Sequence, residues 1–215
     1  MSSSDVSLAL FVPLVAKPDK VEDVSQFVGV GYDLVQAEAE TIQWFGVKYS
    51  DHTPPTFAIV DTFRTEGGRN AHLTGKVAAA LIANAGTLLA TGPEITSAGV
   101  LANKVKEGSA SKTAGLGVGL RVLLTAKPEK VQAVKEFLTG ALPLVDAEPE
   151  TLVWYALEFP GTNNFAIVDF FADEAGRNAH LTGKVAEALF ASVDELLTGA
   201  PDVVKFDVVA ASVKL

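Results

Sequence analysis

The stretch Phe57–Ala78 reads FAIVDTFRTEGGRNAHLTGKVA, and the stretch Phe165–Ala186 reads FAIVDFFADEAGRNAHLTGKVA. Roughly four positions in five are identical, which is far beyond chance for two stretches of one chain. Weaker matches continue on both sides, and the first copy has two extra residues in the loop after Tyr49. The chain is therefore a tandem duplication. The further matched pairs are Lys17 and Lys127, Pro18 and Pro128, Ala37 and Ala147, Glu38 and Glu148, Thr41 and Thr151, Trp44 and Trp154, Pro93 and Pro201, and Val100 and Val208.

The duplication sets the expected domain boundaries. We expect the first ferredoxin-like repeat to span residues 1–105 and the second to span residues 118–215. Residues 106–117 read KEGSASKTAGLG, a segment rich in Gly, Ser and Ala with no apolar period. This composition is typical of a flexible linker.

Each repeat shows the same succession of strand and helix patterns. In the first repeat, proline suits an opening helical turn, so we expect a helix from Pro18, with a kink near Gly29 and Gly31 as an alternative. The second helix covers 66–89, with a break near Gly75 as an alternative. The order β-α-β-β-α-β is the ferredoxin-like arrangement. The expected strands are Leu8–Val15, 41–49, Thr56–Phe63 and 95–105.

A ferredoxin-like unit has both helices on one face of its sheet, so the other face must find a cover. Two copies on one chain can cover each other. The expected fold class is therefore α+β, with two ferredoxin-like (βαββαβ) repeats forming an intramolecular α+β barrel.

The composition excludes several classes of function. The formal net charge of −9 disfavours a nucleic-acid partner, because an acidic surface repels phosphates. We interpret Lys104, Lys106 and Lys112 as part of a solvated linker and not as a binding patch. The chain has no cysteine, which excludes disulfides, thiolate catalysis and cysteine-ligated metals.

The apolar stretches do not resemble targeting or membrane segments. Residues 7–15 are apolar, but Asp5 precedes them where a signal peptide carries positive charge. The longest apolar helical stretch, 77–90, is too short to cross a bilayer and contains Asn84. We therefore expect a soluble, cytoplasmic protein with no membrane partner.

Asp61 and Asp169 occupy matching places in the third strand of each repeat. Strand alternation places Asp61 on the side of Phe57, Ile59 and Phe63. A carboxylate on such a face is costly unless it is paired. A structural ion pair, for example with Arg69 or Arg177, and a functional base or ligand contact are both open.

His72 and His180 lie inside the identical GRNAHLTGK segments, together with Asn70 and Asn178. On one unbroken helix His72 would point away from the apolar face that includes Val77. Packing between helix and sheet is one interpretation of the histidines. The alternative is that these Asn and His side chains face a ligand, a metal or the repeat interface.

Trp44 and Trp154 are the only tryptophans and occupy matching positions. Core packing and a stacking surface for a planar ligand are both compatible with them. The sequence Gly117-Val118-Gly119 lacks the strand-then-helix context of a dinucleotide fingerprint. No HExxH motif, phosphate-binding loop or Ser-His-Asp order is present.

On these residues the chain resembles two fused antibiotic biosynthesis monooxygenase-like domains, members of the dimeric α+β barrel group. The resemblance rests on AEAETIQWF (37–45), AEPETLVWY (147–155) and the FAIVDxF…GRNAHL runs. It implies a cavity between sheet and helices that holds small aromatic molecules, and in some members their oxidation by O₂ without metal or flavin. It implies no fixed catalytic set. Fungal pigment-binding chromoproteins with two ferredoxin-like repeats are a fainter resemblance.

Two functions follow as hypotheses. The first is binding of a small conjugated or aromatic ligand, for example a pigment, and the second is cofactor-independent monooxygenation of a phenolic or quinol-like substrate. No cofactor is expected, although a divalent metal held by His, Asp and Asn stays open. The sequence leaves two oligomeric states open, a monomer and a homodimer formed through exposed strand edges. The candidate ligand-binding residues are Trp44, Asp61, Asn70, His72, Trp154, Asp169, Asn178 and His180.

Overall fold

The computed structural model describes residues 5–106 and 111–214, which form two compact units. The N-terminal unit contains 5–98, 111–115 and 206–214. The C-terminal unit contains 99–106 and 116–205. The units are therefore not identical to the repeats, because each unit includes the end of the other repeat's last strand.

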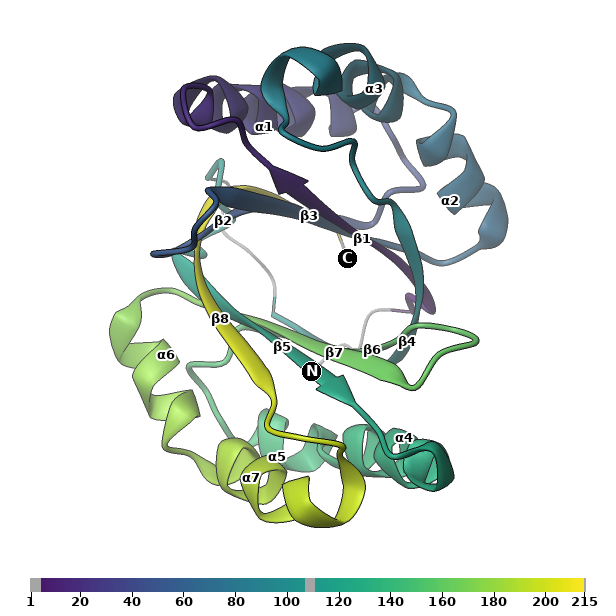
Figure 1. The fold of residues 1–215 in the computed structure, drawn as a ribbon, viewed down its shortest axis with the longest axis vertical. Coiled ribbons are helices and arrows are strands. Elements are labelled where there is room, and N and C mark those ends of the chain that lie inside the picture. Colours follow the sequence, from purple (N-terminus) through teal and green to yellow (C-terminus); the bar gives the residue numbers. More distant parts are fainter. Residues whose placement is uncertain (1–4, 107–110, 215) are drawn as a thin grey trace. The chain divides into compact units, whose positions relative to one another are not determined.

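The N-terminal unit has an antiparallel sheet in the order β1-β3-β2-β8. Its helices cover one face of the sheet, as Figure 1 shows. The strands β1 and β3 agree with the ranges predicted from the sequence. The elements of this repeat are β1 (Leu8–Val15), α1 (Val21–Val35), β2 (Gln43–Tyr49), β3 (Thr56–Phe63), α2 (Glu66–Leu73), α3 (Lys76–Leu88) and β4 (Thr96–Val105).

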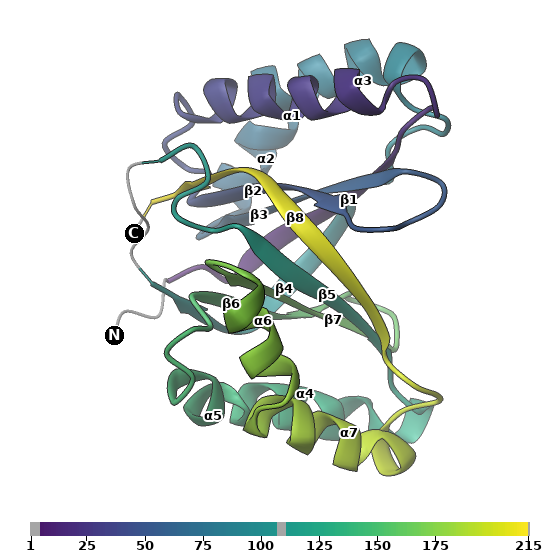
Figure 2. The same ribbon diagram turned by 90° about the vertical axis from the view of Figure 1, so that its left-hand side faces the viewer.

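The C-terminal unit repeats this plan with the sheet order β5-β7-β6-β4. Its helices also gather on one face of their sheet (Figure 2). The α+β class with antiparallel sheets is therefore confirmed. The elements are β5 (Val118–Thr125), η1 (Pro128–Lys130), α4 (Val131–Gly140), α5 (Leu142–Asp146), β6 (Val153–Glu158), β7 (Asn164–Phe171), α6 (Glu174–Leu181), α7 (Lys184–Leu196) and β8 (Asp202–Val213).

The last strand of each repeat pairs with the second strand of the other repeat. In the C-terminal unit, β4 pairs with β6 from Gly99 opposite Glu158 to Val105 opposite Val153. In the N-terminal unit, β8 pairs with β2 over the whole length of β2. This exchange of strands was not anticipated from the sequence, and it brings Lys104 and Lys214 into the other repeat's neighbourhood.

The second helical region of each repeat is broken into two helices, which confirms the alternative of a break near Gly75. A helix ends at Leu73 and a new one begins at Lys76, with Gly75 between them. A Cβ at Gly75 would lie 2.9 Å from the Ala71 carbonyl oxygen, so the close turn requires glycine. The break redirects the chain and lets His72 point to the sheet.

The first helical region differs between the repeats. Helix α1 runs from Val21 to Val35 without interruption at Gly29 or Gly31. In the second repeat the helix is interrupted between α4 and α5, where Pro143 follows. Proline has no N–H to donate to the preceding turn, which explains why this copy breaks.

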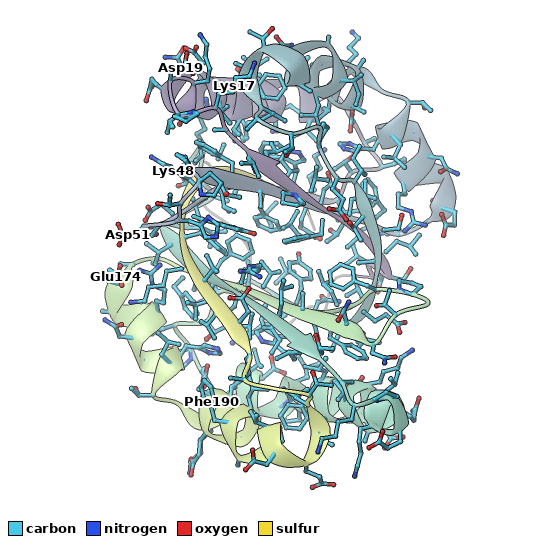
Figure 3. The ribbon with its side chains drawn as sticks, viewed as in Figure 1. Lys17, Asp19, Lys48, Asp51, Glu174 and Phe190 are labelled. Atoms are coloured by element: carbon cyan, nitrogen blue, oxygen red, sulfur yellow. The ribbon has the colours of Figure 1, made fainter. Side chains whose placement is uncertain are left out.

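Buried side chains fill the space between each sheet and its helices (Figure 3). Trp44 anchors the N-terminal core and Trp154 the C-terminal core, and both are fully buried. Among the described residues, no helix combines the length and apolar character needed to cross a bilayer.

Candidate functional site

Asp61 lies on β3 and points toward the helices, as strand alternation predicted. It is 1% exposed, and its partner across the strand pair is Trp44 of β2. Asp169 of β7 is fully buried and faces Trp154 of β6 in the same register. Each repeat thus places one carboxylate on the helix-covered face of its sheet, beside its only tryptophan.

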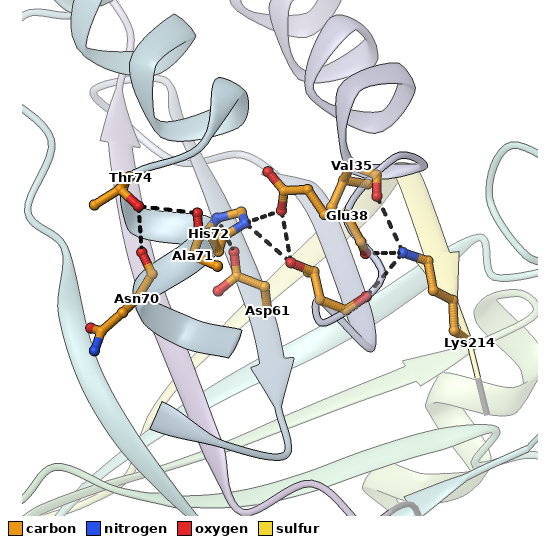
Figure 4. A network of polar contacts seen from close by, with 9 residues as sticks. Val35, Glu38, Asp61, Asn70, Ala71, His72, Thr74 and Lys214 are labelled. Atoms are coloured by element: carbon orange, nitrogen blue, oxygen red, sulfur yellow. Dashed lines mark hydrogen bonds and ion pairs between the residues drawn. The ribbon is translucent and has the colours of Figure 1, made fainter. Parts of the chain in front are cut away.

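His72 reaches this carboxylate from the end of α2. Its Nε2 lies 3.1 Å from Asp61 Oδ2, and its Nδ1 lies 2.6 Å from Glu38 Oε2. The Thr41 hydroxyl donates to the same Glu38 oxygen at 2.8 Å. Figure 4 shows the imidazole between the two carboxylates. The expectation that Asp61 is paired with a positive group is confirmed, with His72 as its partner.

The second repeat contains the same network. His180 Nε2 lies 3.1 Å from Asp169 Oδ2, and His180 Nδ1 lies 2.6 Å from Glu148 Oε2. Thr151 donates to Glu148 at 2.9 Å. The two copies have therefore kept one geometry of acid, imidazole and acid.

The histidines carry positive charge in this setting. Burial alone lowers the pKa of His72, but the hydrogen bonds and charges of Asp61 and Glu38 outweigh it and raise the pKa to about 10. His180 behaves identically, with its pKa raised to about 10 by Asp169 and Glu148 against the effect of burial. Both nitrogens of each ring are engaged, so neither histidine has a free nitrogen to act as a base.

The carboxylates of each network differ in kind. Burial raises the pKa of Asp61 and of Asp169, although the adjacent imidazolium opposes this. Burial also acts to raise the pKa of Glu38, but hydrogen bonds from His72 and Thr41 bring it below its ordinary value. Of the two carboxyl groups in each network, the aspartate is therefore the one whose pKa is raised.

The aspartate oxygens are also the least satisfied. Within the described residues, neither carboxylate oxygen of Asp61 or Asp169 accepts a well-aligned hydrogen bond, and the main partner of each aspartate is the imidazolium 3.1 Å from its Oδ2. Buried polar groups without partners are rare and costly. Such a carboxylate is a candidate for contact with a ligand.

A lysine from the other repeat holds the loop that carries each glutamate. Lys214 donates to the carbonyl oxygens of Val35, Glu38 and Thr41 at 3.2, 2.6 and 3.1 Å (Figure 4). Lys104 donates to those of Val145 and Glu148 at 2.7 and 2.8 Å.

Lys104 corrects one expectation from the sequence. It is 8% exposed and lies in β4, so it does not belong to a solvated linker. Lys106 is exposed, and Lys112 lies over the Tyr32 ring at 5.6 Å. The three lysines therefore share no role, because Lys104 is buried in a strand whereas Lys106 and Lys112 are exposed.

An apolar pocket of about 240 Å³, open to solvent near the exposed Glu136 and Gly140, lies between the helices and sheet of the C-terminal unit. Its walls include Trp154, Ile167, Ala141, Leu144 and Leu189. A smaller cavity of about 30 Å³ adjoins it through shared wall residues Ile167, Val185 and Leu189. The smaller cavity is lined by Asp169 and His180 at its buried end, and by the exposed Phe190 and Val203.

The N-terminal unit has a groove of about 340 Å³ on another side of its network. This groove is lined by Glu38, Glu40, His72 and Lys76 and contains neither Asp61 nor Trp44. Its lining also includes Leu34, Ala37 and Ala71, so it is a mixed groove that differs from the pocket beside Trp154 in its charged residues.

The remaining predicted site residues lie outside the networks. Asn70 and Asn178 are exposed on α2 and α6. Arg69 pairs with Glu66 at 2.8 Å, and Arg177 pairs with Glu174, in each case a glutamate three residues earlier on the same helix. Asp61 and Asp169 pair with histidines instead of with the arginines suggested from the sequence.

Metal binding finds no support in the geometry. In the described ranges, no group of three or more His, Asp or Glu side chains is arranged to hold a metal ion. The metal alternative stays a prediction without a site.

Sequence reasoning missed Glu38, Glu148 and the two lysines. The glutamates were recognisable, since both repeats contain the AExET motif and each glutamate precedes the Thr of the motif and the following Trp by the same spacing. Lys104 and Lys214 gave no such signal, because their role depends on strand pairing between the repeats.

Comparison with known proteins supports the fold. No protein-family model and no curated protein matches the sequence. A candidate monooxygenase from Fusobacterium nucleatum has a TM-score of 0.85 at 14% identity, with 100% of this chain and 96% of that chain covered. A ferredoxin-fold protein from Listeria monocytogenes, related to antibiotic biosynthesis monooxygenases, has a TM-score of 0.56 at 10% identity, with 94% and 95% covered.

This chain has the fold of the antibiotic biosynthesis monooxygenase-like proteins. An anthrone oxidase-like protein shares it at a TM-score of 0.64 and 11% identity, over 99% of this chain and 95% of that chain. The resemblance noted from the AExET and GRNAHL motifs is confirmed at the level of fold. Identities this low carry no activity from these proteins to this one.

Proposed function

We propose that this chain binds a small aromatic or conjugated molecule in the cavity beside Trp154. The observation that carries the proposal is an apolar pocket of about 240 Å³ that adjoins a buried carboxylate, Asp169, which pairs with His180 but accepts no well-aligned hydrogen bond among the described residues. Ligand sites typically combine apolar walls with a few polar groups that fix orientation.

The size of the cavity suits more than one ring. An engineered apolar cavity of about 150 Å³ in another protein is known to hold benzene. A volume of about 240 Å³ therefore favours a bicyclic molecule. Trp154 offers a flat wall against which such a ring can stack.

Asp169 supplies a polar anchor at the adjoining small cavity. A ligand hydroxyl that passes between Ile167 and Leu189 can donate to an Asp169 oxygen, because no well-aligned hydrogen bond in the described chain occupies either oxygen. This requires the side chains shared by the two cavities to change rotamer. A phenolic ligand is therefore favoured over a purely apolar one of the same shape.

Oxidation of the bound phenol is the second candidate function. A buried carboxylate with a raised pKa is suited to take a proton from a phenolic hydroxyl, and His180 keeps a positive charge 3.1 Å away. The electron-rich phenolate can then react with O₂. In the oxidation of a phenol to a quinone, four electrons pass to O₂, one oxygen atom enters the ring and the other leaves as water. The monooxygenase-like and anthrone oxidase-like neighbours favour this class of reaction.

Trp154 fluorescence tests the binding proposal directly. In a Trp44→Phe background, Trp154 is the only tryptophan. We expect 1-naphthol to quench or shift its emission and to bind at least about tenfold more tightly than naphthalene, since a hydrogen bond to a charged group contributes about 1.5–3 kcal/mol. Binding of neither compound would contradict the proposal.

Matched variants locate the polar anchor. Asp169→Asn should reduce the preference for 1-naphthol over naphthalene, while Asp61→Asn, the same change in the other unit, should leave it unchanged. Equal effects of the two variants would contradict the role of Asp169.

Oxygen consumption separates the two functions. If the chain is an oxygenase, a phenolic or quinol substrate should consume O₂ in a ratio of one O₂ per quinone formed, and Asp169→Asn should slow this. A coloured molecule that purifies with the protein, without O₂ uptake, supports a binding protein alone.

A further inference from the structure

We propose that the two copies of the site have diverged, so that only the C-terminal unit accepts an apolar guest, while the corresponding space beside Trp44 is filled by helix α1. This inference rests on the proposed function for the identity of the ligand, but its structural basis is independent. It assigns the difference to a few small residues that occupy matching positions in the repeats.

Gly46 allows α1 to lie directly on the N-terminal sheet. A Cβ at this position would meet Val28 Cγ1 at 2.2 Å and the Trp44 ring at 3.0 Å. Real Cβ atoms do not approach other atoms so closely, so the contact between Val28 and the sheet exists only because residue 46 has no side chain. The helix occupies the space over β2.

Gly31 closes the same region from the helix side. A Cβ there would lie 3.1 Å from the Trp44 ring. Helix α1 continues unbroken past this position, and Trp44 is fully buried beneath it. Two glycines therefore bring the helix, the sheet and the tryptophan into direct contact.

The second repeat has a side chain at both positions. Ala156 replaces Gly46 and Ala141 replaces Gly31, while the larger Leu138 replaces Val28. With a methyl group on the strand, the helix cannot approach as Val28 does. The helix is also interrupted before Pro143. Ala141, Leu138 and Trp154 line the cavity that results.

The polar networks do not share this divergence. The distances from His72 to Glu38 and Asp61 equal those from His180 to Glu148 and Asp169. The N-terminal copy has thus kept the ion pairs that hold its helix to its sheet while its apolar space is filled. The N-terminal network therefore only holds the helix to the sheet, whereas the C-terminal network also borders the space for the ligand.

Xenon tests the divergence without any assumption about the natural ligand. Xenon enters dry apolar cavities regardless of polar recognition. The two tryptophans give two indole N–H signals in an NMR spectrum of isotope-labelled intact protein, which Trp44→Phe assigns. We expect xenon to shift the Trp154 signal and to leave the Trp44 signal in place. A shift of Trp44, or no shift of Trp154, overturns the inference.

Filling the cavity provides a matched control. Ala188 lines the cavity on α7, and Ala80 occupies the same place in α3. Ala188→Leu should abolish the xenon shift of Trp154, and Ala80→Leu should leave it unchanged. A shift that survives Ala188→Leu would place the xenon elsewhere and overturn the assignment.

Calorimetry with 1-naphthol then separates this inference from the proposed function. One molecule bound per chain, lost in Ala188→Leu and kept in Ala80→Leu, supports both. Two molecules per chain overturn the divergence while the binding function stands. Xenon at Trp154 with no 1-naphthol binding supports the divergence and contradicts the proposed function.

Discussion

The N-terminal and C-terminal units share one polar network but differ in the apolar packing beside it. His72 and His180 lie at the same distances from their carboxylates, 2.6 and 3.1 Å. On the strand next to each aspartate, Gly46 and Ala156 set different approaches of helix to sheet. Buried charges are strongly destabilising when a partner moves, whereas apolar volume can be redistributed at lower cost. The polar part of a duplicated site is therefore the slower to diverge.

Of the changes that test this comparison, separation of the two repeats should have the largest effect on folding. A fragment of residues 1–105 lacks β8, so β2 loses its pairing partner and the Glu38 loop loses Lys214. We expect the fragment to be unfolded, or to form a homodimer in which a second copy supplies the missing strand. Dispersed NMR signals from a well-folded monomer would contradict this, because each unit contains parts of both repeats.

Removal of the histidines should have the next largest effect, and it should be equal in the two units. His72→Ala or His180→Ala leaves two carboxylates facing each other without the positive charge between them. Loss of one partner of a buried pair costs about 3–5 kcal/mol. Urea unfolding should show this loss for each variant, and the double variant should lose about the sum, since the networks share no residue. A clear inequality between the two variants would show that the networks are not energetically equivalent.

The raised histidine pKa values predict a loss of stability in alkali. His72 and His180 have a pKa of about 10 in the folded protein, against about 6.5 when unfolded. Their contribution is therefore complete below pH 6.5 and is lost as the pH rises toward 10. Each histidine can lower the unfolding free energy by at most about 1.4 kcal/mol per pH unit in this window. The raised pKa of Asp61 acts in the same direction from a lower pH.

Unfolding free energies at pH 6.5 and pH 9 measure this effect. The range stops at pH 9 because the pKa of Lys104 and that of Lys214 are lowered by burial. Replacement of both histidines by glutamine should flatten the profile. An unchanged slope in that variant would exclude the histidines as its cause.

The sequence alone was sufficient for the strands and for half of each network. Alternation in FAIVDTF placed Asp61 on the helix side, and the repeated GRNAHL segment singled out His72. Both inferences are local, because they depend on the period of one strand or on identity between repeats. Gly75 likewise marked the helix break that turns His72 to the sheet.

The other features depend on contacts that no local pattern contains. Lys214 reaches the Glu38 loop only because β8 pairs with β2, more than a repeat away in sequence. The pocket beside Trp154 depends on Ala156, which replaces Gly46 of the first repeat. The effect of this methyl group can be judged only when the distance between helix and sheet is known. Long-range pairing and packing distances therefore limit what the sequence can predict.

Asn70 and Asn178 should give the smallest effect. Both are identical between the repeats and were candidates for ligand contact, yet their side chains are exposed on α2 and α6. Their carbonyl oxygens accept from Thr74 and Thr182 at 2.9 and 3.0 Å, and alanine keeps these backbone acceptors. Exposed substitutions of this kind change stability by no more than about 0.5 kcal/mol. We therefore expect Asn70→Ala and Asn178→Ala to leave urea unfolding and 1-naphthol affinity unchanged. A loss of affinity in Asn178→Ala alone would extend the ligand site from the cavity to the outer face of α6.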